Sequence, residues 1–317
     1  MDNLTVILGY GATGRNVVER LLARGDAVRV AQRSRPADLP PGAQFIACDG
    51  LDSASLDAAI RGARQVVMAI GLAYDAKVWR RVWPPLMSHV LSACEAHGAR
   101  LVFIDNLYML GPQTAPLTED MPLTDRGAKP AIRAEVTRLW RAAAEAGRVR
   151  VAAIRPPDFY GPGVGNSHLG DTALGALAQG KPALMVPRAD LPHDFAFVPD
   201  IGRAAVTLLD AEDSAFNQVW NAPCAPTRTP RELVALAAAA LGRPARLQSL
   251  PIWTLPALGL AVPSLAEVAD MAFTFDRPYR VDWSKWAKAF WDDPTPFEIG
   301  IPLAARSFAR PLLAAAA

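Results

Sequence analysis

The first half of the chain alternates short apolar runs with amphipathic stretches of helical period. The apolar runs that we interpret as strands are Leu4–Leu8, Ala27–Ala31, Phe45–Cys48, Gln65–Ile70, Leu101–Ile104 and Val149–Ile154. The intervening stretches that we interpret as helices are Arg15–Arg24, Ser53–Arg61, Trp79–His97 and Arg133–Ala146. Continuous apolar runs are typical of strands buried on both faces of a parallel sheet. The alternation therefore predicts an α/β fold with a doubly wound parallel sheet and helices on both faces.

The pattern changes after Arg155, where prolines, glycines and loops become frequent. Strand-like pieces recur at Ala183–Val186 and Gln218–Asn221, and a helix is expected at Pro230–Ala240, with proline in its first turn. This change of texture predicts a second, smaller domain of mixed α+β structure.

The expected domain boundaries follow from this change. We assign residues 1–155 to the first domain and expect residues 195–225 to return to it. Residues 156–194 and 226–317 are expected to form the smaller, mostly C-terminal substrate domain.

Composition narrows the class of protein. The 317 residues are 51% hydrophobic and 20% charged, which favours a folded core over intrinsic disorder. The formal net charge of +2 gives no reason to expect a nucleic-acid or membrane-surface partner. Three distant cysteines, Cys48, Cys94 and Cys224, lack the spacing of a metal cluster or a disulfide framework. No targeting segment is visible, and prolines interrupt the longest uncharged run, so we expect a cytoplasmic protein. We also expect that the protein holds no metal and that it acts on a small molecule.

A glycine motif stands between the first expected strand and the first expected helix. Residues 9–14 read Gly-Tyr-Gly-Ala-Thr-Gly, the G-x-G-x-x-G pattern of dinucleotide-binding Rossmann sheets. In that pattern Gly9 allows the tight turn, Gly11 lets the backbone approach a pyrophosphate, and Gly14 lets the helix pack closely on the strand. The N–H groups at the helix start, from Ala12 and Thr13 onward, would then face the phosphates. The alternative is a glycine-rich turn without a ligand.

The end of the second expected strand bears on the choice of coenzyme. NAD sites usually place a carboxylate there to bond the ribose 2′-hydroxyl, whereas this chain has Arg33 and Arg35 nearby. A guanidinium can pair with a 2′-phosphate, so we predict NADP(H) in preference to NAD(H), with Arg33 as the contact. Both arginines could instead be solvated loop charges. Asp49, after the third strand, is a candidate for the adenine amino group or for a local cap.

Four segments together resemble a known family. They are the glycine motif, residues 101–111 (Leu-Val-Phe-Ile-Asp-Asn-Leu-Tyr-Met-Leu-Gly), residues 155–163 (Arg-Pro-Pro-Asp-Phe-Tyr-Gly-Pro-Gly) and residues 195–201 (Phe-Ala-Phe-Val-Pro-Asp-Ile). The chain resembles the extended or atypical short-chain dehydrogenase/reductase superfamily, specifically its NAD-dependent epimerase/dehydratase group. The resemblance implies a nucleotide-dependent enzyme and a homodimer. We also place Ala69 and Gly71, at the end of the fourth strand, among the coenzyme contacts.

The chain departs from this family at the catalytic positions. The resemblance leads us to expect a Ser or Thr after the fifth strand, followed by a Tyr-x-x-x-Lys pair. Here Asn106 replaces the Ser or Thr, and Lys129 and Arg133 align with the pair. Tyr108 is a candidate replacement donor, with Lys129 or Arg133 lowering its pKa by positive charge. Arg133 is also a candidate ribose contact. The alternatives are a packing role for Tyr108 and a solvated loop position for Lys129.

A second departure concerns the substrate. Nucleotide-sugar enzymes of the group usually carry an arginine just before the segment at 195–201, where this chain has His193. Histidine is a poor anchor for a doubly charged diphosphate. The residues expected to line the pocket are instead largely apolar: Leu72, Tyr74, Trp79, Trp83, Phe159, Ile252 and Trp253. His168 lies in a loop that could approach a ligand.

These observations favour an NADP(H)-dependent oxidoreductase that reduces a small carbonyl or related unsaturated group. Two alternatives stay open. One is a sugar epimerase or dehydratase that uses the nucleotide transiently. The other is a redox sensor that binds NADP(H) without catalysis.

Overall fold

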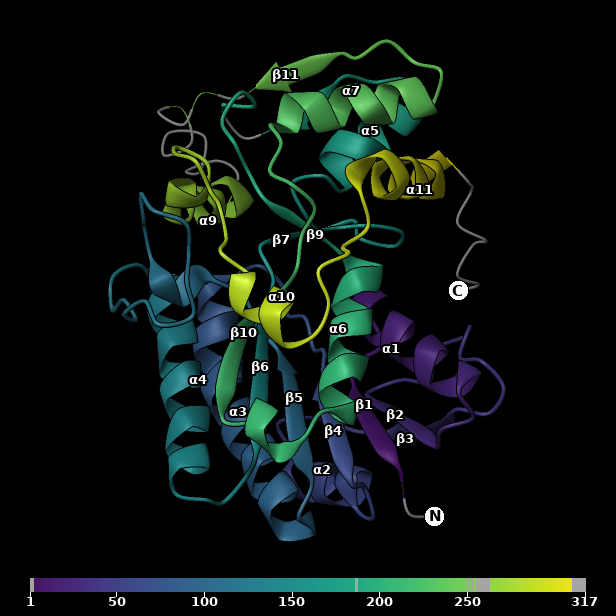
Figure 1. Ribbon diagram of the computed structural model, residues 1–317, viewed down its shortest axis with the longest axis vertical. Coiled ribbons are helices and arrows are strands. Elements are labelled where there is room, and N and C mark those ends of the chain that lie inside the picture. The colour runs from purple at the N-terminus through teal and green to yellow at the C-terminus, as the bar shows by residue number, and fades with distance from the viewer. Residues whose placement is uncertain (1–2, 186–187, 250, 252–253, 255–262, 310–317) are drawn as a thin grey trace. The chain divides into compact units, whose positions relative to one another are not determined.

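The computed structural model describes residues 3–185, 188–249, 251, 254 and 263–309, and the chain divides into two compact units (Figure 1). Unit 1 comprises residues 1–109, 122–155 and 201–220. Unit 2 comprises residues 110–121, 156–200 and 221–317. The segment that rejoins the first unit is thus 201–220, and a short piece of the first half, 110–121, belongs to the second.

A seven-stranded sheet forms the centre of the described part of unit 1, in the order β10-β6-β5-β4-β1-β2-β3. Its strands are β1 (Thr5–Leu8), β2 (Val28–Gln32), β3 (Gln44–Ala47), β4 (Gln65–Met68), β5 (Arg100–Ile104), β6 (Val151–Arg155) and β10 (Gln218–Asn221). Neighbouring strands from β3 to β6 pair in parallel. The strand order reverses between β4 and β1, which places a topological switch point there. The predicted α/β fold is confirmed.

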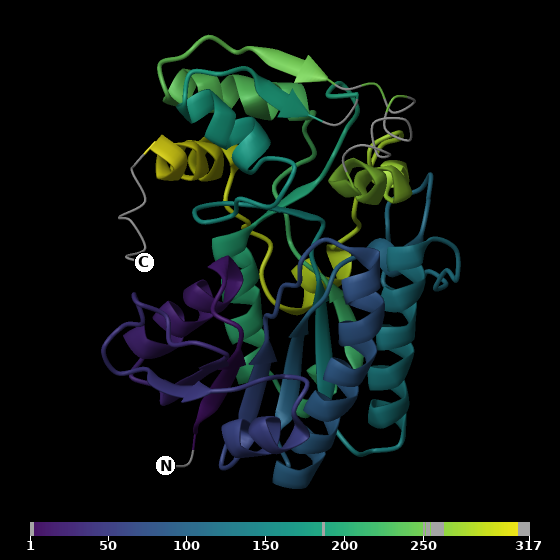
Figure 2. The same cartoon turned by 180° about the vertical axis from the view of Figure 1, so that it is seen from behind.

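Helices cover both faces of this sheet, as the opposite views in Figures 1 and 2 show. The helices that belong wholly or largely to unit 1 are α1 (Ala12–Ala23), α2 (Ser53–Ile60), α3 (Ala76–His97), α4 (Ala128–Glu145) and α6 (Val198–Asp210), with short 3-10 turns η1 (Tyr108–Leu110) and η3 (Asp213–Ala215). The apolar faces of α2, α3 and α4 share one buried cluster with the sheet, through residues such as Leu56, Val90 and Trp140. Helices α1 and α6 lie on the other face.

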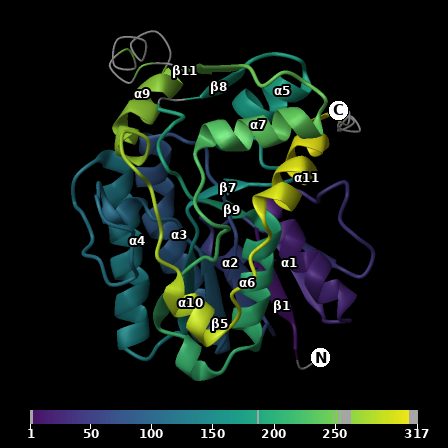
Figure 3. The same cartoon turned by 45° about the horizontal axis from the view of Figure 1, so that its top comes forward.

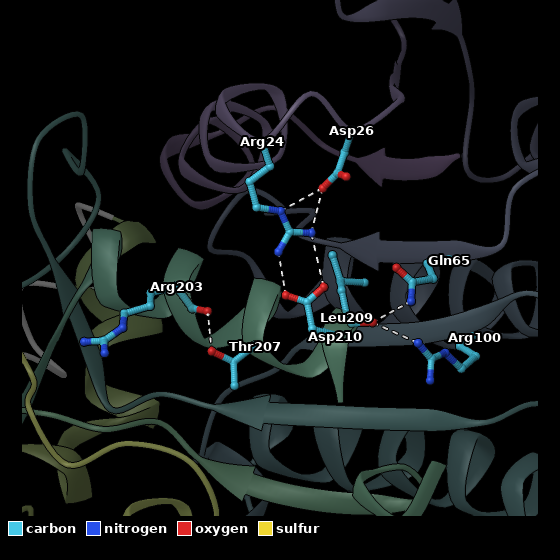
Figure 4. Close-up of polar contacts among 8 residues, drawn as sticks. All are labelled: Arg24, Asp26, Gln65, Arg100, Arg203, Thr207, Leu209 and Asp210. Atoms are coloured by element: carbon cyan, nitrogen blue, oxygen red, sulfur yellow. Dashed lines mark hydrogen bonds and ion pairs between the residues drawn. The ribbon is translucent and has the colours of Figure 1, made fainter. Parts of the chain in front are cut away.

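Side chains from the sheet hold the carboxyl end of α6 (Figure 4). The last carbonyls of a helix lack partners within the helix. Here the Leu209 carbonyl accepts from Gln65 Nε2 at 2.6 Å and from Arg100 Nη2 at 2.8 Å. Arg24, which follows α1, binds the Asp210 carboxylate through two nitrogens, at 2.5 and 3.1 Å. The rejoining segment is therefore fixed at its end to β4, β5 and α1.

Unit 2 is built from short paired strands and helices (Figure 3). Strand β7 (Asp158–Tyr160) pairs with β9 (Phe195–Phe197), and β8 (Ala183–Met185) pairs with β11 (Leu247–Ser249), both in parallel. The helical segments are η2 (Asp171–Gly175), α5 (Ala176–Ala178), α7 (Pro230–Ala240), α9 (Pro263–Asp270), η5 (Ala272–Thr274), α10 (Ser284–Ala289) and α11 (Phe297–Ala309). Their buried cluster includes Tyr160, Leu233 and Ile301.

Helix α7 begins at the residue that the sequence predicted. Thr229 caps it by accepting from the Glu232 N–H, and the Glu232 carboxylate accepts in return from the Thr229 N–H, which forms a capping box. Among the helices that the structure describes, none is both long and apolar enough to cross a membrane. Ile252 and Trp253, expected at the pocket, lie outside the described residues.

Candidate functional site

The glycine motif forms a tight turn between β1 and α1. Gly9 has a φ of +94°, and a Cβ there would lie 2.9 Å from the Ala69 carbonyl oxygen. A Cβ on Gly14 would lie 2.1 Å from the Gly9 carbonyl oxygen, so α1 can start this close to β1 only with glycine at position 14. Gly11 caps α1, and a Cβ on it would meet nothing within 4 Å. The turn thus leaves open space at the amino end of α1, where Ala12 and Thr13 begin the helix, and backbone N–H groups can bind an anion.

The position usually taken by a ribose-binding carboxylate holds Gln32, at the end of β2. Its Oε1 accepts from the Tyr10 N–H at 3.0 Å, and its Nε2 donates to the Ser34 carbonyl at 2.8 Å. Gln32 therefore ties the tip of β2 to the glycine turn. The sequence analysis missed this role, because it depends on a contact between residues 22 positions apart.

Three arginines surround this tip. Arg33 is exposed directly after β2, and the guanidinium of Arg35 lies 5.7 Å from the centre of the Phe45 ring. Arg15, on the first turn of α1, lies 4.5 Å from the centre of the Tyr10 ring and pairs with Asp38. The sequence analysis did not single out Arg15. Arg15 thus contacts the glycine turn while paired with Asp38, and Arg33 follows directly after Gln32, which bonds to the turn. A guanidinium can bind a phosphate group.

Asp49 and Ala69 have local roles in the structure. Asp49 Oδ1 accepts from the Leu51 N–H at 3.0 Å, and the Asp49 N–H donates to Ser55 Oγ at 3.0 Å. Asp49 therefore closes the turn that precedes α2. This is the local cap that the sequence analysis gave as one of two possible roles. Ala69 extends β4 by donating its N–H to the Leu8 carbonyl at 2.9 Å. Gly71 is exposed, with room for a Cβ. The coenzyme contacts expected of these three residues stay predictions.

The residues after β5 are held by one side chain. Asn106 Oδ1 accepts from the Tyr108 N–H at 3.1 Å, which fixes the start of η1. The half-buried Tyr108 ring lies nearly parallel to Trp79, with centres 6.2 Å apart and planes at 16°. Trp79 in turn meets the Tyr74 ring edge-on at 5.8 Å. Tyr74, Trp79 and Tyr108 form one group at the carboxyl ends of β4 and β5, which we call the aromatic group.

Lys129 lies against the aromatic group. Helix α4 begins at Ala128, five residues before the predicted start, because Pro130 is compatible with a first helical turn. The Lys129 side chain is fully buried, and Nζ lies 4.3 Å from the centre of the Tyr74 ring. The alternative that Lys129 is a solvated loop residue is therefore wrong. Its charge also contributes to holding the pKa of Asp75 below the ordinary value, after the hydrogen bond from the Val78 N–H, which is the largest cause.

Arg133 lies one turn further along α4 and is buried. It pairs with the Asp105 carboxylate, and its guanidinium lies 4.2 Å from the Trp83 ring centre. Arg155 Nε lies 3.3 Å from the other Asp105 oxygen, and burial lowers the pKa of Arg155 despite that neighbour. Within the described residues, Arg133 Nε and Nη1 have no hydrogen-bond partner. A ribose hydroxyl could satisfy such a donor. The sequence analysis missed Asp105, the residue that fixes Arg133.

The amino-acid sequence matches a known family and a known enzyme. Residues 5–222 match the sequence model of the NAD dependent epimerase/dehydratase family. Over 224 residues the chain is 32% identical to a 3-diazoavenalumate denitrifying reductase of a Streptomyces species, a match that covers 64% of this chain and 70% of that protein.

Solved structures share the fold. UDP-glucuronic acid 4-epimerase from Bacillus cereus in complex with NAD superposes with a TM-score of 0.79 at 15% identity, covering 96% of this chain and 98% of that chain. A dTDP-glucose 4,6-dehydratase, DesIV, from Streptomyces venezuelae gives 0.79 at 20% identity, covering 96% of each chain. At these identities the likeness concerns the fold alone.

Proposed function

Because the chain belongs to the NAD-dependent epimerase/dehydratase family and is an NAD(P)-dependent enzyme, we propose that it is an NADP(H)-dependent reductase of a small carbonyl or related unsaturated group. The observation that carries the proposal is the open glycine turn with a basic margin. Gly9 and Gly14 leave the amino end of α1 free for a diphosphate, and Arg33 and Arg15 border it. Family membership and the enzymes it resembles argue against a sensor without catalysis.

The preference for the phosphorylated coenzyme rests on the tip of β2. In NAD sites a carboxylate at this position bonds the ribose 2′-hydroxyl, and such a carboxylate would repel a 2′-phosphate. This chain has the uncharged Gln32 there. We assign the 2′-phosphate to the exposed Arg33 guanidinium, with Arg15 as a second neighbouring charge. We also assign Asp49, Ala69 and Gly71 to the coenzyme site, with Asp49 facing the adenine amino group.

The aromatic group and Lys129 would serve the reaction. Bound NADPH supplies a hydride when a carbonyl is reduced, and the product oxygen then needs a proton. We assign that proton to the Tyr108 hydroxyl, whose position Asn106 fixes through the backbone. The buried Lys129 charge would stabilise the phenolate that remains. Arg133 would donate to a ribose hydroxyl through the nitrogens that lack partners among the described residues.

A second candidate is reductive removal of nitrogen from an aryl diazo compound. The relative at 32% identity is named a 3-diazoavenalumate denitrifying reductase. A hydride added to an arenediazonium ion gives the arene and N₂, so the atoms and charges balance without any external proton. Such a reaction would not need the tyrosine that is missing from the family's usual position, where Lys129 stands.

One set of assays separates these possibilities. Titration should show binding of NADPH at least tenfold tighter than of NADH, and a carbonyl panel should deplete NADPH absorbance with one of its members. In Tyr108→Phe, carbonyl reduction should fall about 10²-fold, the lower range for losing a general acid. Diazo reduction with N₂ release that is unchanged in Tyr108→Phe would favour the second candidate. Absence of binding to either coenzyme would overturn both.

The setting of the enzyme is inferred from its thiols and charge. Cys48, Cys94 and Cys224 are free and buried, which supports a reducing, cytoplasmic compartment. We infer a small-molecule substrate, with neither nucleic acid nor membrane as partner, and a homodimer as in the resembled family.

A further inference from the structure

Helix α4 places two cations in the interior of unit 1, one helical turn apart. The Lys129 side chain is fully buried, and that of Arg133 is only 1% exposed. Lys129 Nζ lies 4.3 Å from the centre of the Tyr74 ring, the arrangement in which an aromatic face attracts an ammonium ion. The Arg133 guanidinium lies against the Trp83 ring and pairs with Asp105. Both charges therefore act where little water screens them.

The buried carboxylates do not balance this positive charge. Within the described part of unit 1, Asp105 is the one carboxylate that is buried, and it is shared between Arg133 and Arg155. Asp75 also feels the charge of Lys129, but it is partly exposed to solvent, and its side chain caps the start of α3. Lys129, Arg133, Arg155 and Asp105 together therefore carry a net formal charge of +2 in the interior.

The hydrogen bonding of the two arginines shows the same imbalance. Among the described residues, Arg133 Nε and Nη1 and Arg155 Nη1 have no hydrogen-bond partner. Buried donors of this kind require an acceptor, and an excess of buried positive charge raises the free energy of any further cation placed beside it. The end of α4 thus favours a neutral group that offers oxygen acceptors and disfavours a cationic group.

The strand order places one half of a bound coenzyme beside these cations. The glycine turn follows β1, which has β2 with Arg33 after its end on one side, and β4 followed by β5 on the other. With the diphosphate at the turn and the adenosine half over β2, the nicotinamide half lies at the carboxyl ends of β4 and β5. Tyr74 comes after β4 and Asp105 directly follows β5, and these two residues contact Lys129 and Arg133.

We propose that Lys129 and Arg133 make this site selective for the reduced form of the coenzyme. The nicotinamide ring is positively charged in NADP⁺ and neutral in NADPH, whereas the rest of the molecule is the same. The buried charges therefore weaken binding of the oxidised form without affecting that of the reduced form. The inference rests on the proposed function, because it takes the coenzyme to be bound at the glycine turn. It also argues against an epimerase or dehydratase, which must begin with the oxidised coenzyme to remove a hydride from its substrate.

Calorimetric titration of the full-length wild-type protein with NADPH and with NADP⁺ tests the proposal without any variant. NADPH should bind about tenfold more tightly or better, which corresponds to a rise of about 30 mV in the reduction potential of the bound coenzyme. Because the charges are buried, the ratio of the two Kd values should change less than about twofold between about 0.05 M and about 0.5 M NaCl. Equal affinities would overturn the proposal and leave the proposed function standing, whereas failure of both forms to bind would overturn the proposed function as well.

A variant assigns the effect to the buried ammonium. Lys129→Met keeps a long apolar side chain, and it should reduce the preference for NADPH about fivefold by strengthening NADP⁺ binding, because one of two buried charges is lost. The matched control is Lys77→Met, which removes an exposed lysine at the start of α3 and should leave the ratio unchanged. The probe 2′-phospho-ADP-ribose, which lacks the nicotinamide, should bind equally to the wild type and to Lys129→Met. An unchanged ratio in a Lys129→Met protein that still binds this probe would overturn the proposal.

Discussion

The Lys129 ammonium lies over the face of Tyr74, with Nζ 4.3 Å from the ring centre. Burying an ammonium group without a partner is costly in free energy. The face of an aromatic ring attracts the charge and lowers that cost. The residue at the family's tyrosine position is therefore a fixed cation beside the aromatic group.

This pair should be measurable as a coupling energy. Tyr74→Leu and Lys129→Met, combined in a double-mutant cycle of unfolding by urea, should give a coupling of about 0.5–2 kcal/mol, the range for a cation–π contact. Tyr74→Phe retains a ring face and serves as the matched control, so its cycle with Lys129→Met should give a coupling near zero. Additive effects of Tyr74→Leu and Lys129→Met would show that the contact contributes nothing.

The glycine turn predicts a contrast between two alanine substitutions. Gly14→Ala should cost about 1–3 kcal/mol of stability by overpacking, because its Cβ would meet the Gly9 carbonyl. Gly11→Ala has room for its Cβ and should unfold at the wild-type temperature while binding NADPH more weakly. Thermal unfolding and fluorescence titration check both. A Gly11→Ala variant with unchanged NADPH affinity would place the diphosphate elsewhere.

Arg33 should govern the choice between coenzymes. Arg33→Gln should raise the Kd for NADPH about tenfold and leave that for NADH unchanged, since only the phosphorylated form loses a charge-assisted contact. Arg61→Gln, which removes an exposed arginine paired with Asp57 on α2, is the control. Equal weakening of both coenzymes by Arg33→Gln would argue against a 2′-phosphate contact.

The Arg133–Asp105 pair predicts strong destabilisation when one partner is removed. Asp105→Asn leaves the guanidiniums of Arg133 and Arg155 buried without their shared carboxylate, and loss of one partner of a buried pair costs about 3–5 kcal/mol. The double variant Arg133→Met/Asp105→Asn should recover part of that loss. Urea unfolding measures both, and a single variant as stable as the wild type would contradict the prediction.

The free energy of unfolding should decrease in two ranges as the pH is lowered. Burial lowers the pKa of His168 in the folded state, so the unfolded chain takes up its proton first, and stability decreases as pH falls through the ordinary histidine pKa of 6.5. The pKa of Asp158 is also lowered, because the neighbouring His168 and the hydrogen bond with His193 outweigh the effect of burial, so its contribution is present above 3.8 and is lost as pH falls further. Urea midpoints between about pH 8 and about pH 2 cover both ranges. His168→Gln should flatten the upper range.

The sheet of unit 1 was predictable because most of its strands contain a continuous apolar run and glycines follow several of the helices. Gly98, for example, ends α3 in the left-handed conformation with a φ of 64°. The start of α4 could not be predicted, because Pro130 is equally compatible with the first turn of a helix and with a helix break. In unit 2, β7 meets a partner 37 residues away, and short strands of that kind leave no local signal.

Only part of the candidate site could be predicted from the sequence. The glycine motif carries its own geometry, so its turn could be placed from residues 9–14 alone. Gln32, Arg15 and Asp105 could not be found in this way, because each acts through contacts distant in sequence. The burial of Lys129 likewise depends on Tyr74, which comes from another loop.

The arrangement of β10 beside β6 has a consequence for how the polypeptide is made. Strand β6 ends at Arg155, but its outer neighbour is not synthesised until residue 221. A fragment that stops at 155 would expose the backbone of β6 as a bare edge, the kind of surface on which chains aggregate. During translation the coenzyme-binding half therefore stays unfinished while the ribosome adds more than sixty further residues.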